Sequence, residues 1–83
     1  MSRTARRMDN AIGKRVRLAR RLRDMSLADL APRLGLTPQQ LQRSEAGARR
    51  LPAATIYQVA TVLHLPVDWF FIVDVGHPDK YQT

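Results

Sequence analysis

Two glutamines and one arginine share a face of a predicted helix, and their side chains suit contact with nucleic-acid bases. Gln39, Gln42 and Arg43 are spaced i, i+3 and i+4, and residues at this spacing are neighbours on an α-helix. The amide of Gln matches the donor and acceptor of adenine, and the guanidinium of Arg matches the two acceptors of guanine. No acidic residue interrupts this outward face, which favours a surface that lies against phosphates.

The helix that carries these side chains has clear signals at its start. Thr37 is the expected N-cap, Pro38 fits the first helical position, and Gln40 completes a capping box. The pattern predicts a helix over residues 38–46 with Leu41 turned inward, ended by a glycine.

A shorter helix is predicted just before it. Ser26 is its expected N-cap, Asp29 completes a second capping box, and Gly35 ends it in a left-handed turn. Two short helices joined by a glycine-containing turn form a helix-turn-helix, whose second helix enters the major groove of DNA. The sequence therefore predicts recognition of duplex DNA by residues 38–46.

Three further helices complete the predicted fold, an all-α bundle of five helices. The first runs from about Asn10, its expected cap, to Arg23, the fourth carries an apolar stripe, and the fifth spans Val67 to about Val73. We expect a flexible basic arm at residues 1–8, the helix-turn-helix domain at 9–75 and a tail at 76–83. The inward residues of the first and fourth helices are Ile12, Val16, Ala19, Ile56, Val59, Ala60 and Leu63.

Positive charge is concentrated in the first part of the chain. The 83 residues carry a formal charge of +7, and residues 1–50 hold 13 basic and 4 acidic side chains. A polyanionic partner is one explanation, a solvated face is a second, and an anionic membrane surface is a third. No apolar run is long enough for a membrane span, and the absence of cysteine excludes disulfides and thiolate metal sites.

The sequence resembles the Xre family of phage repressors, Cro proteins and bacterial regulators over roughly residues 10–71. The resemblance implies a repressor-type fold, operator binding and a homodimer. The segments that carry it are Ile12-Gly13-Lys14-Arg15-Val16-Arg17, Met25-Ser26, Leu30-Ala31, Leu34-Gly35-Leu36-Thr37, Gln40-Leu41, Glu45-Ala46-Gly47, Val59-Ala60, Leu63 and Pro66-Val67-Asp68-Trp69-Phe70.

The resemblance also implies a structural ion pair between Arg20 and Glu45. Contacts to DNA phosphates are expected from the start of the second helix, from the cap of the third helix and from the basic loop after it. The residues expected to make them are Ser26, Thr37, Gln40, Arg49 and Arg50. Arg3, Arg6 and Arg7 either follow a minor groove as a flexible arm or form an unstructured tail.

Some residues depart from the family pattern. Leu27 stands where a Gln that touches the DNA backbone is common, and Pro38 replaces a polar residue that often contacts a base. Pro32 lies inside the second helix, where we expect a distortion rather than loss of the fold. Leu18 and Leu22 form an i, i+4 apolar pair where the family usually has charge, and the pair is either covered by the N-terminal arm or used in a subunit or partner contact.

The C-terminal aromatic residues cannot all be buried in so small a domain. We expect Trp69 in the core, at least one Phe at a subunit interface, and a strand-like pairing of residues 72–75 between two subunits. No catalytic group, metal site or cofactor motif is predicted.

The leading expectation is a cytoplasmic, nucleoid-associated, prokaryotic or phage regulator that binds double-stranded DNA as a homodimer, most simply as a repressor. The alternative is an antitoxin that binds a toxin protein and autoregulates its own promoter. The fold serves both roles, so the sequence does not separate them.

Overall fold

The computed structural model describes residues 2–72, and all regular structure in that range is helical. The predicted all-α class is confirmed. The predicted five α-helices are instead four α-helices and two 3₁₀-helices within residues 2–72. In chain order they are α1 (Arg3–Leu22), α2 (Leu27–Leu30), η1 (Ala31–Leu34), α3 (Pro38–Glu45), α4 (Ala53–Leu63) and η2 (Val67–Phe71).

Helix α1 begins at Arg3, seven residues before the start predicted at Asn10. The side chain of Ser2 caps it by accepting a hydrogen bond from the amide of Ala5 at 3.0 Å. Residues 3–8 are therefore the start of α1 in the structure, where the sequence predicts a basic arm. Sequence periodicity missed this turn because its arginines are exposed, although Met8 packs partly against the core.

Pro32 explains why the second helix changes form part way along. Proline has no backbone N–H to donate to the carbonyl four residues earlier, and the chain tightens from α2 into the 3₁₀-helix η1 at that point. The expected distortion without loss of the fold is thus observed. Gly35 then adopts a left-handed conformation with φ of 69° and turns the chain toward α3.

The last two elements place the aromatic residues differently from the prediction. Phe70 on η2 is fully buried, whereas Trp69 is only partly buried, so Phe70 and not Trp69 is the core aromatic residue. Trp69 instead packs edge-on against Phe70 and lies 3.7 Å beneath the guanidinium of Arg15. Phe71 is exposed, and Ile72 lies in no strand. Residues 73–83, including most of the predicted strand and the whole tail, lie outside the described residues.

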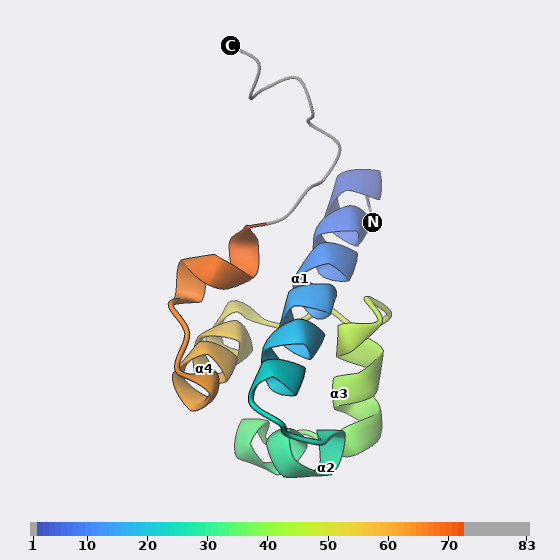
Figure 1. The fold of residues 1–83 in the computed structure, drawn as a ribbon. Coiled ribbons are helices and arrows are strands. Elements are labelled where there is room, and N and C mark those ends of the chain that lie inside the picture. Colours follow the sequence, from blue (N-terminus) through green and yellow to red (C-terminus); the bar gives the residue numbers. More distant parts are fainter. Residues whose placement is uncertain (1, 73–83) are drawn as a thin grey trace.

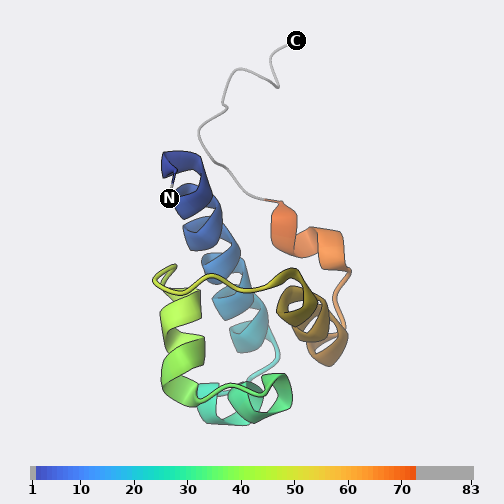
Figure 2. The same ribbon diagram turned by 180° about the vertical axis from the view of Figure 1, so that it is seen from behind.

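The elements surround α1, which runs through the centre of the molecule. Figures 1 and 2 show α3 on one side of α1 and α4 on the other, with α2 and η1 at the C-terminal end of α1. The core forms where these elements meet, and it includes every inward residue predicted for α1 and α4. None of the helices in residues 2–72 is long and apolar enough to cross a membrane.

Candidate nucleic-acid interface

Helix α3 presents the predicted polar face to solvent. Leu41 is completely buried, while Gln39, Gln42 and Arg43 are all exposed. The residues that hold α3 in this orientation are Leu41, Ser44 and Glu45, which form its buried side. The structure thus places the three candidate base-reading residues together on the open side of one rigid helix, which ends at Glu45, one residue earlier than predicted.

A close approach of α1 and α3 fixes the position of this face. Gly13 on α1 lies directly against the backbone carbonyl groups of Ser44 and Glu45 on α3, with no space for a Cβ atom. Any larger residue at position 13 would push the two helices apart. The glycine therefore sets how far α3 stands out from the body of the molecule.

The ion pair implied by the family resemblance forms at the same helix contact. Arg20 donates from Nε to Glu45 Oε2 at 2.7 Å and from Nη2 to Oε1 at 3.0 Å, a two-pronged arrangement. A third donor, Nη1, bonds the carbonyl oxygen of Met25 at 2.8 Å. Hydrogen bonding to Glu45 raises the pKa of Arg20 above its usual range. The pair fastens α3 to the end of α1 and to the start of the helix-turn-helix.

Both predicted capping boxes are present at the edges of the candidate interface. Thr37 Oγ1 accepts from the amide of Gln40 at 3.1 Å, and Gln40 Oε1 accepts from the amide of Thr37 at 2.9 Å. Ser26 and Asp29 make the same reciprocal bonds at the start of α2. These bonds use the acceptor atoms of Thr37, Gln40 and Ser26, so their side-chain donors are left available for a phosphate.

The carboxylate at the start of α2 limits what that helix end can bind. Asp29 Oδ2 accepts from the amide of Ser26, and the hydrogen bonds with Ser26 lower the pKa of Asp29 below its ordinary value of 3.8. The backbone N–H of Ser26 therefore already donates to the Asp29 carboxylate and is not free to bind a phosphate. Ser26 can then contact a DNA phosphate only by donating from its side-chain hydroxyl.

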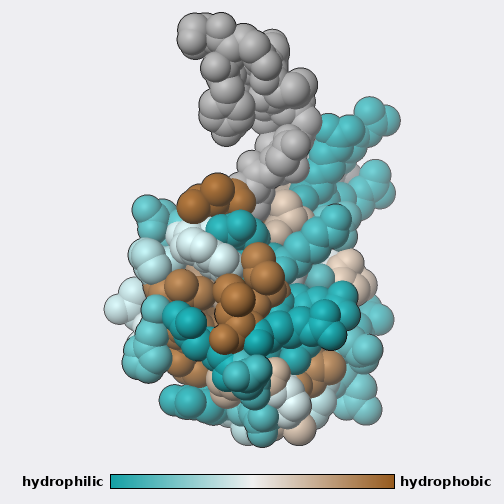
Figure 3. Space-filling view, in the orientation of Figure 1, coloured by the Kyte–Doolittle hydropathy of each residue, from teal (hydrophilic) through white to brown (hydrophobic). Residues whose placement is uncertain are grey.

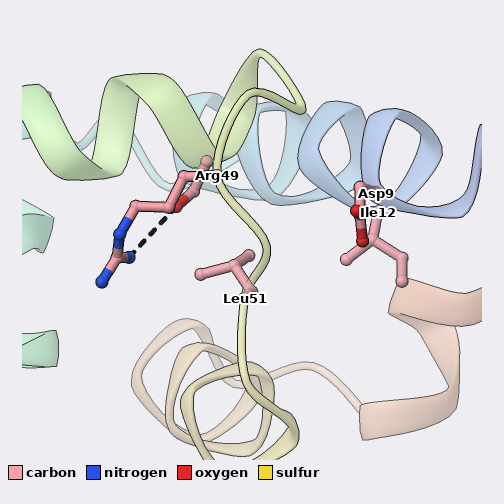
Figure 4. A pocket seen from close by; sticks show the side chains of 5 residues that line it. Asp9, Ile12, Arg49 and Leu51 are labelled. Carbon is pink, nitrogen blue, oxygen red and sulfur yellow. Dashed lines mark hydrogen bonds between the residues drawn. The ribbon is translucent and has the colours of Figure 1, made fainter. Parts of the chain in front are cut away.

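The two arginines of the loop after α3 are anchored to the body of the protein. Arg49 Nη1 donates to Ser44 Oγ at 3.4 Å, and Arg50 Nε pairs with Asp9 Oδ1 at 3.2 Å. Figure 4 shows Arg49 extending along α3 from a small hollow of about 10 Å³, with Asp9 on α1 on its other side. The Arg50 side chain remains about half exposed, so its charge is accessible as well as positioned.

Sequence reasoning missed one residue that lies beside the candidate face. Arg17 on α1 is exposed, and together with Gln42 it lines a hollow of about 250 Å³ between α1, α2 and α3. Leu27 and Ala46 also line it, and the paired side chains Arg20 and Glu45 complete it. The signal for Arg17 was present in the sequence as helical spacing of basic residues along α1, but only the packing of α3 shows which side of α1 is involved.

Comparison with known proteins identifies the same segment. A model of the helix-turn-helix family matches residues 16–70. A protein of Rhodospirillum rubrum, described as an uncharacterized transcriptional regulator in the ATPase CF(0) region, is 37% identical over 70 residues, covering 84% of this chain and 65% of its own.

Two relatives from rhizobia are similar at the same level. An uncharacterized HTH-type transcriptional regulator of Sinorhizobium medicae is 38% identical over 64 residues, which cover 77% of this chain and 46% of its own. One of Sinorhizobium fredii is 36% identical over 76 residues, which cover 92% of this chain and 51% of its own. The chain thus spans about half to two thirds of the length of these relatives. No solved structure matches it significantly.

Proposed function

This chain belongs to the helix-turn-helix family, of the Xre type that its sequence resembles, and we propose that it is a sequence-specific DNA-binding regulator of transcription. The relatives it matches are named as uncharacterized transcriptional regulators, which supports this proposal. In this proposal the chain acts by binding and not by catalysis. Its partner is double-stranded DNA, and its simplest mode of action is steric repression, in which bound protein blocks access to the DNA.

The observation that carries the proposal is the open polar face of α3. Gln39, Gln42 and Arg43 are exposed on a helix whose opposite side is locked into the core by Leu41. An α-helix fits into the major groove of B-DNA, where amide and guanidinium groups distinguish adenine and guanine by paired hydrogen bonds. We assign base reading to these three side chains.

Phosphate contacts would hold the helix in the groove. Thr37 and Gln40 lie at the N-terminus of α3, and their side-chain donors are not used by the capping box. Ser26 contributes its hydroxyl, while Arg49 and Arg50 supply charge from the loop after α3. Such contacts give affinity that falls steeply with salt, without sequence preference.

Selection of bound duplexes from a random pool, at physiological salt, tests the proposal directly. We expect the unmodified protein to select a defined consensus. At one base position of that consensus, Arg43→Ala should lose about 1–3 kcal/mol of discrimination between the preferred base and the others. Arg43→Lys is the matched control, because it keeps the charge but loses the two-pronged contact. It should lose discrimination while keeping the salt dependence.

Arg50→Ala should weaken all sequences alike, because Arg50 is assigned to phosphate. An unchanged ratio of consensus to random affinity in Arg43→Ala would show that the base-reading face is misassigned. Absence of any consensus for the unmodified protein would refute sequence-specific regulation.

The proposal includes a homodimer on an inverted repeat. Apolar surface collects on the side of α4 and η2 in Figure 3, and exposed residues there are Tyr57, Val67, Phe71 and Ile72. This side lies across α1 from α3 (Figures 1 and 2), so two copies joined there keep both α3 faces open. Their recognition helices would enter successive major grooves about 34 Å apart.

Sedimentation of Phe71→Glu beside the unmodified chain tests the dimer. We expect the unmodified chain to be a dimer and Phe71→Glu to be a monomer. The consensus that the unmodified chain selects should be palindromic. A monomeric unmodified chain would refute the dimer. Copurification of a small protein partner with the untagged chain, lost in Phe71→Glu, would instead favour the antitoxin alternative.

A further inference from the structure

Five basic residues lie along one side of α1, two at its start and three in its second half. Counted from Arg3, the others lie 3, 11, 14 and 18 residues further on, each close to a whole number of turns of a helix that repeats about every 3.6 residues. At a rise of about 1.5 Å per residue the stripe is about 27 Å long. We call it the α1 stripe, and its members, all exposed, are Arg3, Arg6, Lys14, Arg17 and Arg21.

The charges of the stripe are not neutralised within the described part of the chain. None of its five side chains has an acidic partner within residues 2–72, whereas Arg20 binds Glu45 and Arg50 binds Asp9. Like charges three or four residues apart on a helix destabilise it. Lys14, Arg17 and Arg21 have this spacing and therefore repel one another. A stripe that served only stability would alternate basic with acidic residues. This one stores repulsion that a polyanion would relieve.

The stripe lies on the flank of α1 that borders α3. Helix α3 packs against Gly13 and pairs with Arg20, and these positions directly precede Lys14 and Arg21 of the stripe. Arg17 and Gln42 line the same hollow between the helices. The basic stripe therefore meets the face assigned to base reading at Arg17.

The hollow itself carries one uncompensated charge. Glu45 and Arg20 neutralise one another there, and Leu27 and Ala46 add only apolar surface. Arg17 therefore determines its electrostatic character. A group that enters beside Gln42 meets an unpaired guanidinium.

We propose that the α1 stripe is a second phosphate-binding surface, which follows the DNA strand bordering the groove that α3 occupies. This inference rests on the proposed function in that duplex DNA is the partner. Arg17 and Arg21 contact the phosphates nearest to Gln42, and Arg3 and Arg6 continue the contact along the flanking backbone. The helical start of α1 at Arg3 thus places these arginines on the same side of one helix as Arg17 and Arg21.

The salt dependence of duplex binding measures these contacts one by one. Each phosphate contact contributes about 0.9 to the slope of log K against log salt. We expect Arg17→Gln/Arg21→Gln to lower the magnitude of that slope by about 1.8. The advantage of the unmodified protein over this variant then shrinks roughly 12-fold between 50 and 200 mM salt. The ratio of consensus to random affinity stays the same, because phosphate contacts carry no sequence information.

A matched control changes the net charge equally but elsewhere. Gln58→Glu/Thr61→Glu adds two negative charges at exposed positions of α4, across α1 from α3. Thr61 lies one turn from Tyr57 of the proposed dimer side, so slopes are compared only at a protein concentration at which sedimentation shows all variants in the same oligomeric state. Charges more than about 10 Å from the duplex are largely screened, so this variant should keep the slope of the unmodified protein. An equal fall in slope in the control and in the stripe variant would overturn the proposal, because net charge alone would then explain the effect.

Arg3→Gln/Arg6→Gln tests the other end of the stripe independently. It should also lower the slope, and both stripe variants should unfold at slightly higher urea concentration because repulsion is removed. Unchanged slopes in both pairs would overturn the proposal. Loss of binding to vesicles of phosphatidylserine and phosphatidylcholine in equal parts, with duplex binding intact, would also overturn it and assign the stripe to a membrane.

Failure of the proposed function gives a different result from failure of the stripe proposal. If the unmodified protein binds all duplexes equally, sequence-specific regulation is wrong. The salt slopes of the stripe variants can then still be measured on random DNA, since phosphate contacts need no consensus.

Discussion

Removal of Arg20 should cost this small protein much of its stability. Arg20 makes two hydrogen bonds to Glu45, at 2.7 and 3.0 Å, and the two side chains are 11% and 5% exposed. Arg20→Met would keep the length of the side chain but leave the Glu45 carboxylate buried without a partner. Breaking a buried ion pair from one side costs about 3–5 kcal/mol.

That loss is large against the total. Domains are stabilised by about 0.05–0.15 kcal/mol per residue, which gives roughly 4–12 kcal/mol for this chain. Glu45→Leu should cost less than Arg20→Met, because Arg20 keeps its bond to the carbonyl oxygen of Met25 and reaches the surface. The double variant Arg20→Met/Glu45→Leu should recover most of the loss, since apolar replacement of a buried pair is often neutral or better.

Urea unfolding of the three variants, followed by far-UV circular dichroism and by the fluorescence of Trp69, gives the double-mutant cycle. We expect the double variant to be clearly more stable than Arg20→Met. A cost below about 1 kcal/mol for Arg20→Met, the range of a surface pair, would refute the reasoning, as would simple additivity of the two single changes.

Three further predictions follow from other contacts. Gly13→Ala should lower stability by at least about 1–3 kcal/mol, the cost of overpacking a tight contact, and should weaken DNA binding because α3 is displaced; urea unfolding and binding assays check both. The pKa of the Asp29 carboxyl should lie below 3.8 by NMR titration, so its contribution to stability is complete above that pH and is lost as the pH falls through its folded value; Ser26→Ala should move it only part of the way back, because the backbone bond remains. Arg15→Ala should cost about 1–2 kcal/mol and change Trp69 fluorescence, because the guanidinium covers the indole and its Nη2 donates to the Trp69 carbonyl oxygen at 2.9 Å; unchanged fluorescence would show that the stacking is absent in solution.

The helix-turn-helix was predictable because its signals are local. A capping box needs only a Ser or Thr and a suitable residue three positions later, and both boxes formed at the predicted residues. The outward position of Gln39, Gln42 and Arg43 followed from helical periodicity around Leu41. Their contacts with DNA remain a prediction.

Errors of prediction arose where the outcome depends on packing between distant segments. Burial of Phe70 in place of Trp69 depends on how η2 meets α1 and α4, and adjacent aromatic residues give no local signal of which one turns inward. The start of α1 at Arg3 was missed because an exposed helical turn has no apolar periodicity. Ser2, a good N-cap residue, was the available signal.

The amino-acid sequence by itself determined the class of fold, the caps of α2 and α3, the outward side of the recognition helix and the imbalance of charge, because each depends on residues within one or two helical turns. Only the tertiary structure decided how these parts meet. It set α3 against Gly13, engaged Arg49 and Arg50 within the protein, and left Arg17 without an acidic partner among the described residues, next to Gln42. Helical spacing places a residue on one side of its own helix, but the choice of neighbouring helix depends on packing across the whole core.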